Sequence, residues 1–187
     1  MKIKAIQVRK GMVITFKNDL YRVYEATHVT PGKGNALMQI KMKRLSDGNK
    51  AEQRYRPDES VEKATLLTRE FQYLYDDGMN FHFMDTETFE QIQLPEEDLQ
   101  DARYYMLPET LVTLLFHDGK PIDIELPPSV ELRVEETEPN MKGATATGSY
   151  KPAILETGLQ TQIPPFVEAG EVIRVDTRDG KYMDRVK

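Results

Sequence analysis

Residues 20–43 read LYRVYEATHVTPGKGNALMQIKMK, and in this stretch two strand-like runs flank the tip Pro31-Gly32-Lys33-Gly34. Pro31 restricts the approach to the tip, and the two glycines tolerate positive φ or close contact with another surface. Lys33 supplies the only long functional side chain of the tip. Most Gly-Lys-Gly turns are ordinary hairpin tips, but a projection with one amine also suits a narrow, negatively charged cleft.

The run after the tip alternates apolar and polar residues from position 38 to position 43, the period-2 pattern of a half-buried strand. The alternation puts its two lysines on one solvated face, and a turn at Asp47-Gly48 leads to a polar edge strand. Five cations can form a basic sheet surface beside the tip: Lys41, Lys43, Arg44, Arg54 and Arg56. A surface of this kind is sufficient for contacts with RNA phosphates.

The charge of the chain is unevenly distributed. The 187 residues carry a net charge of −6, but residues 1–63 hold 14 Lys and Arg against 7 Asp and Glu, a net +7. Residues 64–128 hold 3 against 14, a net −11, and residues 129–187 hold 8 against 10. A basic segment beside an acidic one can orient a molecule on a polyanion, and we assign RNA binding to the basic segment.

Turn signals divide the rest of the chain into short strands. Asp77-Gly78, Asp118-Gly119 and Asp179-Gly180 each separate two strand-like runs, and Pro95 begins a short helix. We therefore predict a mostly β protein of three small β-barrel domains, at residues 1–63, 64–127 and 128–187, with the central one resembling an OB-fold. Residues 139–152 are rich in Gly, Thr, Ala and Ser, and they predict an exposed loop.

Enzyme signatures are missing from the sequence. The chain has no cysteine, its three histidines are scattered, and no P-loop, GxSxG or GxGxxG pattern occurs. Aspartates at the turns are explained by local hydrogen bonding. The N-terminus has no apolar signal region, and no apolar run approaches the length of a membrane span. We expect a cytoplasmic, monomeric protein that is not an enzyme, needs no cofactor or metal, and does not bind membranes.

Several segments together resemble the bacterial elongation factor P family. They are the tip, Tyr75-Asp76-Asp77-Gly78, Lys151-Pro152-Ala153, and the run from Gly170 to Arg178 followed by Tyr182 and Arg185. The similarity spans essentially the whole chain in order. It implies an L-shaped protein in which an SH3-like (KOW-type) barrel precedes two OB-folds.

The resemblance also implies a function. Such factors bind the ribosome next to peptidyl-tRNA and relieve stalling at consecutive prolines. By this analogy Lys33 approaches the acceptor end of the tRNA and in many members carries an enzymatic extension, so a lysine-modifying enzyme is a further expected partner. Tyr182 and Arg185 match positions that face ribosomal RNA.

The sequence departs from the family pattern at three places: Thr30, Leu37-Met38 and Thr161. The departures leave open whether Lys33 is modified and whether the chain is a divergent paralogue. A general single-stranded RNA-binding protein or RNA chaperone built from the same barrels remains the alternative.

Overall fold

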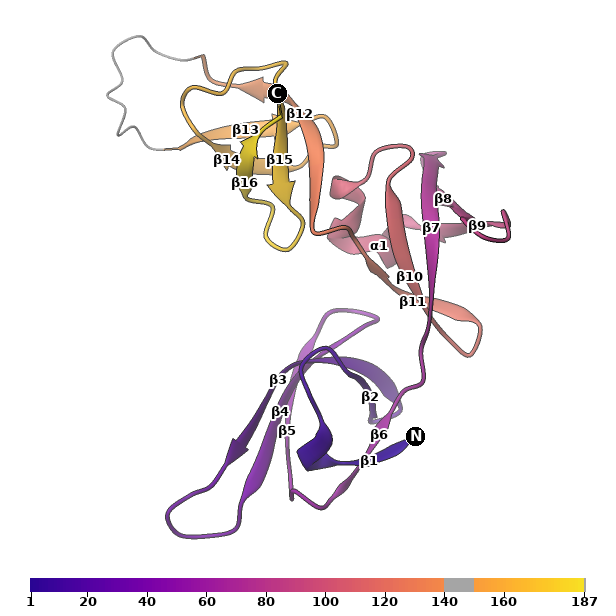
Figure 1. Cartoon of the computed structure of the whole chain (residues 1–187), viewed down its shortest axis with the longest axis vertical. Coiled ribbons are helices and arrows are strands. Elements are labelled where there is room, and N and C mark those ends of the chain that lie inside the picture. The colour runs from indigo at the N-terminus through magenta and orange to yellow at the C-terminus, as the bar shows by residue number, and fades with distance from the viewer. Residues whose placement is uncertain (140–149, 187) are drawn as a thin grey trace. The chain divides into compact units, whose positions relative to one another are not determined.

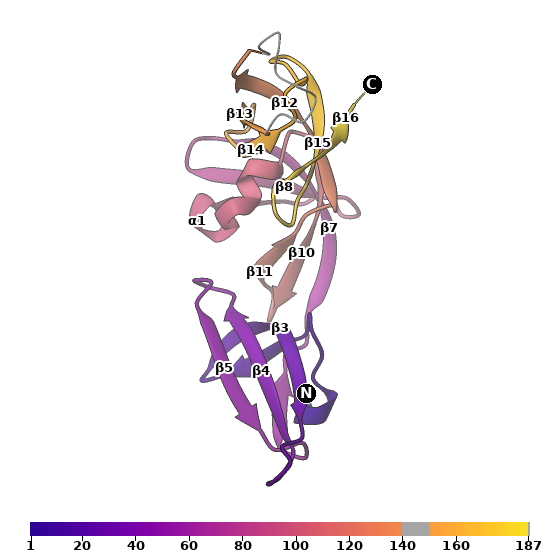
Figure 2. The same cartoon turned by 90° about the vertical axis from the view of Figure 1, so that its left-hand side faces the viewer.

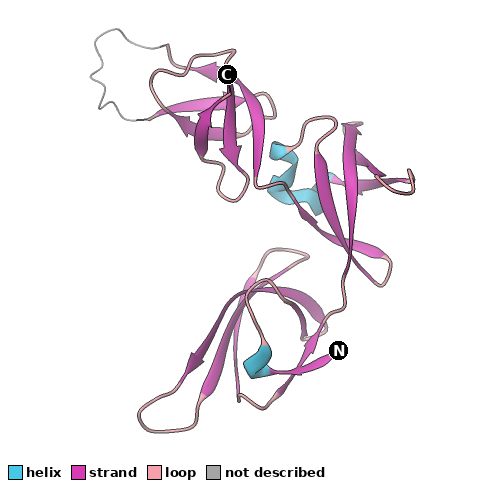
Figure 3. Cartoon of the chain, in the orientation of Figure 1, coloured by secondary structure: helices cyan, strands magenta, loops and turns pink. Residues whose placement is uncertain are grey.

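The computed structural model describes residues 1–139 and 150–186, and most of this chain is β-strand (Figures 1 and 3). The mostly β fold is confirmed. Most of the loop expected at 139–152 lies outside the described residues. No helix in the described ranges is long and apolar enough to cross a membrane.

The first sheet has six strands in the order β1-β6-β2-β3-β4-β5. Their bounds are β1 Lys2–Lys4, β2 Val13–Phe16, β3 Asp19–Val29, β4 Leu37–Arg44, β5 Lys50–Tyr55 and β6 Ser60–Lys63, and a 3₁₀ turn, η1, covers Ala5–Gln7. Side chains from one face of this curled sheet form a closed core that includes Ile14, Val23, Ile40 and Met42, each no more than 1% exposed. The period-2 pattern at positions 38–43 therefore predicted the buried face correctly.

The second sheet has the order β11-β10-β7-β8-β9. Its elements are β7 Leu67–Asp76, β8 Asn80–Asp85, β9 Gln91–Pro95, α1 Glu96–Leu99, a 3₁₀ segment η2 Gln100–Tyr105, β10 Leu111–His117 and β11 Lys120–Glu125. The helix predicted after Pro95 is a single α-turn that continues as 3₁₀, because Gln100 adopts a φ of 49° and breaks the α-helical path. Asp118 and Gly119 both have positive φ, as the predicted two-residue hairpin requires.

The third sheet has the order β14-β13-β12-β15-β16. Its strands are β12 Ser129–Thr137, β13 Lys151–Leu155, β14 Gln160–Ile163, β15 Val172–Asp176 and β16 Tyr182–Arg185. The core under this sheet also receives Tyr105 from η2, and Tyr104 packs against it. Thr157, between β13 and β14, adds a hydrogen bond to η2, because its hydroxyl donates to the carbonyl oxygen of Tyr104 at 2.6 Å.

By packing, the chain groups into two compact units. One contains Met1–Thr68 with Leu115–Asp123, and the other contains Arg69–Leu114 with Ile124–Lys187. The tip of the β10–β11 hairpin thus packs with the first sheet, where Asp123 accepts a hydrogen bond from Arg22 at 2.8 Å. The three domain ranges read from the sequence stay a prediction.

Candidate nucleic-acid interface

The β3–β4 hairpin forms an arm that ends in the predicted tip. The two strands pair from Tyr21 opposite Arg44 to Val29 opposite Leu37. The connecting residues extend beyond the other strands of the first sheet, at the lower left of Figure 1. The arm therefore carries the tip on two paired strands, which hold it more firmly than an isolated loop would.

The two glycines of the tip differ. Gly34 has a φ of 120°, a conformation that side-chain-bearing residues rarely adopt. Gly32 lies outside that region of φ, and a Cβ added there would meet no atom within 4 Å. Only Gly34 is therefore required by the backbone.

Lys33 lies exposed at the end of the arm. Within the described ranges no hydrogen bond, ion pair or ring contact engages its side chain. The amine is thus available to an external partner and is not neutralised by neighbouring carboxylates. Pro31 and Gly32 beside it are exposed as well.

Three of the five predicted sheet cations are engaged by acidic neighbours. Lys41 forms an ion pair with Glu25 at 2.9 Å and donates a hydrogen bond to its other carboxylate oxygen at 3.1 Å, and this hydrogen bond raises the pKa of Lys41. Arg44 donates to Tyr21 and to Asp47, each at 3.0 Å, and the bond to Tyr21 raises the pKa of Arg44. A carboxylate oxygen of Glu52 lies 4.0 Å from Nε of Arg54.

The remaining two sheet cations, Lys43 and Arg56, are exposed, and the described part of the chain provides no acidic partner for either side chain. Lys43 faces outward together with Lys41, as the alternation predicted. It lies opposite Lys50, which the sequence reasoning missed. Only the strand register could have revealed that pair. Lys50 follows a turn, and the residues after it do not alternate between apolar and polar as residues 38–43 do.

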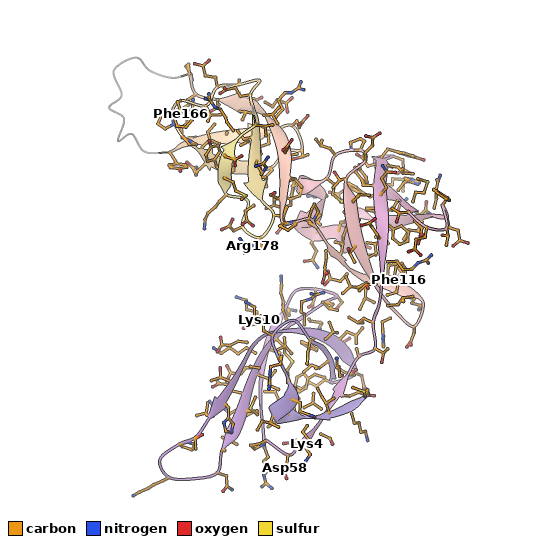
Figure 4. The ribbon with its side chains drawn as sticks, viewed as in Figure 1. Lys4, Lys10, Asp58, Phe116, Phe166 and Arg178 are labelled. Atoms are coloured by element: carbon orange, nitrogen blue, oxygen red, sulfur yellow. The ribbon has the colours of Figure 1, made fainter. Side chains whose placement is uncertain are left out.

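The C-terminal candidates lie on β16. Arg185 bonds to Glu171 at 2.9 Å, and its guanidinium lies 5.4 Å from the ring centre of Phe166. Tyr182 is half-buried and packs against the third core. Phe166 and Arg178, both labelled in Figure 4, lie exposed in the connections that precede and follow β15, and Asp176 engages Arg178. Arg178 and Arg185 are thus paired with acids, and the exposed ring of Phe166 contacts Arg185.

The central aromatic residues divide between core and surface. Phe71, Tyr73 and Phe83 are buried in the core. Tyr75 is 51% exposed and stacks on His82, with ring centres 4.5 Å apart. A bulge between Tyr73 and Tyr75 turns Tyr75 to the outer face.

The aspartates at the turns have structural partners. Asp77 accepts hydrogen bonds from His82 and from the backbone N–H groups of Met79 and Asn80, and these bonds lower the pKa of Asp77 to about 2. Across the described residues, no three His, Asp or Glu side chains gather closely enough to hold a metal ion. Local turn geometry thus accounts for the position of Asp77 and for its lowered pKa.

Three family models match successive parts of the chain. The model described as "Elongation factor P (EF-P) KOW-like domain" matches residues 4–61, the one described as "Elongation factor P (EF-P) OB domain" matches residues 66–124, and the one described as "Elongation factor P, C-terminal" matches residues 130–185. Each match corresponds to one of the three sheets.

Curated relatives are similar over their full length. The elongation factor P of Acidithiobacillus ferrooxidans is 47% identical over 185 residues, which cover 99% of this chain and 100% of that protein. The one from Moorella thermoacetica is 49% identical over 177 residues, 95% of this chain and 96% of that protein. The one from Phenylobacterium zucineum is 46% identical over 187 residues, all of both chains.

A solved structure shares the fold. It is titled eukaryotic translation initiation factor 5A from Methanococcus jannaschii, and it superposes with a TM-score of 0.55 at 19% identity. The match covers 67% of this chain and 94% of that one. At this identity the likeness concerns the fold alone.

Proposed function

Because the chain belongs to the elongation factor P family of translation factors, we propose that it binds the ribosome next to peptidyl-tRNA and stimulates peptide-bond formation at consecutive prolines. The observation that carries the proposal is Lys33, an exposed amine that lies at the end of a two-stranded arm and has no side-chain partner among residues 1–139 and 150–186. The partners would be ribosomal RNA and the acceptor end of the tRNA, and the site of action would be the cytoplasm.

The proposed role of Lys33 is positioning. Proline is a constrained and poor acceptor, so the reaction slows when the peptidyl end is badly oriented. A cation that holds the phosphates of the acceptor end in place removes part of the orientational entropy barrier. A gain of about 2.8 kcal/mol would accelerate the step roughly 100-fold.

In this mechanism the protein is an accessory factor rather than an enzyme. The ribosome supplies the reacting groups, and the arm supplies order and charge. An enzymatic extension of Lys33 would lengthen the reach of the amine, and the exposed tip leaves room for a modifying enzyme to approach it. Measurement of the intact mass of protein from its native host tests this part, since an unmodified mass would contradict it.

We expect Lys33→Ala to abolish the stimulation of a reporter with consecutive prolines, while a proline-free reporter is translated normally. The assay is translation in a system depleted of the factor and supplemented with wild type or variant. Lys10→Ala, which removes another exposed lysine of the same unit, is the matched control. The side chain of Lys33 bonds to no residue that the structure describes, so thermal unfolding should be unchanged. Equal rescue by Lys33→Ala and wild type would refute the proposed role.

Binding measurements separate this function from general RNA binding. A translation factor of this kind should bind ribosomes that carry peptidyl-tRNA much more tightly than it binds free single-stranded RNA of similar length. Filter binding at matched salt gives both affinities. Comparable affinities would favour the general RNA-binding alternative.

A further inference from the structure

Lys43 on β4 and Lys50 on β5 form a directly opposed pair of like charges. The neighbouring N–H of Arg44 donates to the carbonyl oxygen of Asn49 at 2.8 Å, so the pair next to it is of the non-hydrogen-bonded type. The Cα atoms in such a pair lie about 4.5 Å apart, and the side chains share one face. Both lysines are exposed. Two ammonium groups therefore project side by side from the base of the arm.

Their surroundings do not neutralise this pair. One row nearer the tip, Lys41 lies between Glu25 on β3 and Glu52 on β5, so that row carries its own acids. In the row of Lys43, the facing residue on β3 is Arg22, a third cation, and Asp123 is bonded to that arginine. In the described structure neither Lys43 nor Lys50 has a carboxylate partner.

The arrangement is unfavourable for the free protein, because like charges directly opposite each other destabilise an antiparallel pair. Protection of the sheet edge explains the lysine on β5 but not the one on β4. β5 is the edge strand, where a lysine discourages pairing with another chain. Lys43, however, lies on β4, which has a neighbour on both sides. Edge protection does not require a second cation there.

We propose that Lys43 and Lys50 together bind a backbone phosphate of RNA in the ribosomal complex, as a second anchor of the arm. The inference rests on the function proposed above and adds a contact to it. A phosphate diester presents two anionic oxygens to two neighbouring ammonium groups, and its charge offsets their repulsion. Lys41, Arg44 and Arg54 contribute less, because internal acids already engage them.

This anchor lies at the opposite end of the arm from Lys33. The β3–β4 and β4–β5 connections are at opposite ends of the strands, which run side by side in Figures 1 and 2. Lys43 lies six residue steps along the strand from Leu37, or about 20 Å at about 3.3 Å per residue. Contacts at the base and at the tip would fix the direction of the arm, which a single contact cannot do.

The test is Lys50→Glu in the full chain. The change replaces a repulsive cross-strand pair with an attractive one, so we expect the midpoint of thermal unfolding to rise by about 1–3 °C. Affinity for ribosomes carrying peptidyl-tRNA should nevertheless fall about tenfold at low salt. The slope of log K against log salt should lose about one unit, the value for one phosphate contact. Greater stability together with weaker binding is a combination that a purely structural role would not produce.

Lys4→Glu is the matched control, because Lys4 is an exposed lysine on β1, the opposite edge of the same sheet. It makes the same change in net charge and should leave affinity within about twofold of wild type. An equal loss in both variants would overturn the inference in favour of a general charge effect. Unchanged binding by Lys50→Glu, with wild type bound normally, would overturn the inference alone. Failure of the wild type to bind ribosomes would overturn the proposed function as well.

Discussion

At the scale of single residues, the tip shows that two identical residues in one motif can have different physical roles. The conformation of Gly34 requires the absence of a Cβ, whereas that of Gly32 does not. The sequence suggested backbone freedom at both positions, because it cannot reveal which of two neighbouring glycines takes the positive φ. The open space around Gly32 instead suits close approach of a partner.

Alanine substitutions should separate the two roles. Gly34→Ala should destabilise the tip by about 1 kcal/mol, since a residue with Cβ is strained at positive φ. Gly32→Ala should leave the conformation of the tip unchanged. NMR chemical shifts of residues 30–36 report this difference. Large shift changes in Gly32→Ala with none in Gly34→Ala would contradict the assignment. If Gly32→Ala keeps the conformation of the tip but impairs translation, the impairment reflects a lost contact with the partner rather than a distorted loop.

At the scale of elements, the sequence predicted well which face of a strand is buried, but it predicted poorly which residues face each other across two paired strands. Alternation identified the buried face of β4, because that strand is regular. On β3, however, a bulge between Val23 and Glu25 brings Glu25, instead of Tyr24, opposite Lys41. A single inserted residue thus decides that Lys41 meets a carboxylate. The bulge after Tyr73 likewise turns Tyr75 outward. Bulges depend on how a whole sheet closes, so local patterns do not disclose them.

Contacts between elements also explain one departure from the family pattern. The hydroxyl of Thr161 on β14 donates to the carbonyl oxygen of Gly180 at 2.6 Å. Gly180 itself has a φ of 69°, and a Cβ built on it would lie 2.9 Å from the hydroxyl oxygen of Tyr105. The turn between β15 and β16 therefore packs closely against η2, and the polar residue at position 161 has a hydrogen-bonding role.

Gly180→Ala should destabilise the chain markedly. The positive φ alone costs about 1–2 kcal/mol, and the clash with Tyr105 adds to it. In a Tyr105→Phe background the hydroxyl is absent, so the same substitution should cost less. Urea unfolding of the four proteins gives the coupling energy. Costs that are equal in the two backgrounds would show that the turn and η2 do not interact as described.

At the scale of the whole molecule, the sequence predicted three β domains, while packing groups the chain into two units. The difference arises from η2 and the β10–β11 hairpin. η2 buries Tyr105 in the core of the third sheet, and Asp123 on β11 bonds to Arg22 of the first. Turn signals mark where strands end, but they do not reveal which core an intervening segment enters.

Each of the three sheets also holds a carboxylate with a lowered pKa. Backbone donation from Asn49 lowers the pKa of Asp47 on the β4–β5 turn. The bond from His82 lowers the pKa of Asp77 to about 2, and the bond from Arg178 lowers that of Asp176 to about 2. Because these values lie below the unfolded value of about 3.9, the folded state binds fewer protons than the unfolded state in acid.

The stability that these groups contribute is therefore fully present above about pH 4 and is lost as the pH falls towards 2. We expect the urea midpoint to change little between pH 6 and pH 5 and to decline steadily below pH 4. Asp176→Asn should be less stable at neutral pH and should show a shallower decline between pH 4 and pH 2, because one of the linked protons is removed. A midpoint that rises on acidification below pH 4, or a decline equally steep in Asp176→Asn, would contradict this account. The loss of stability in acid should occur in all three sheets, since each has its own carboxylate with a lowered pKa. Hydrogen exchange resolved by residue can follow the sheets separately.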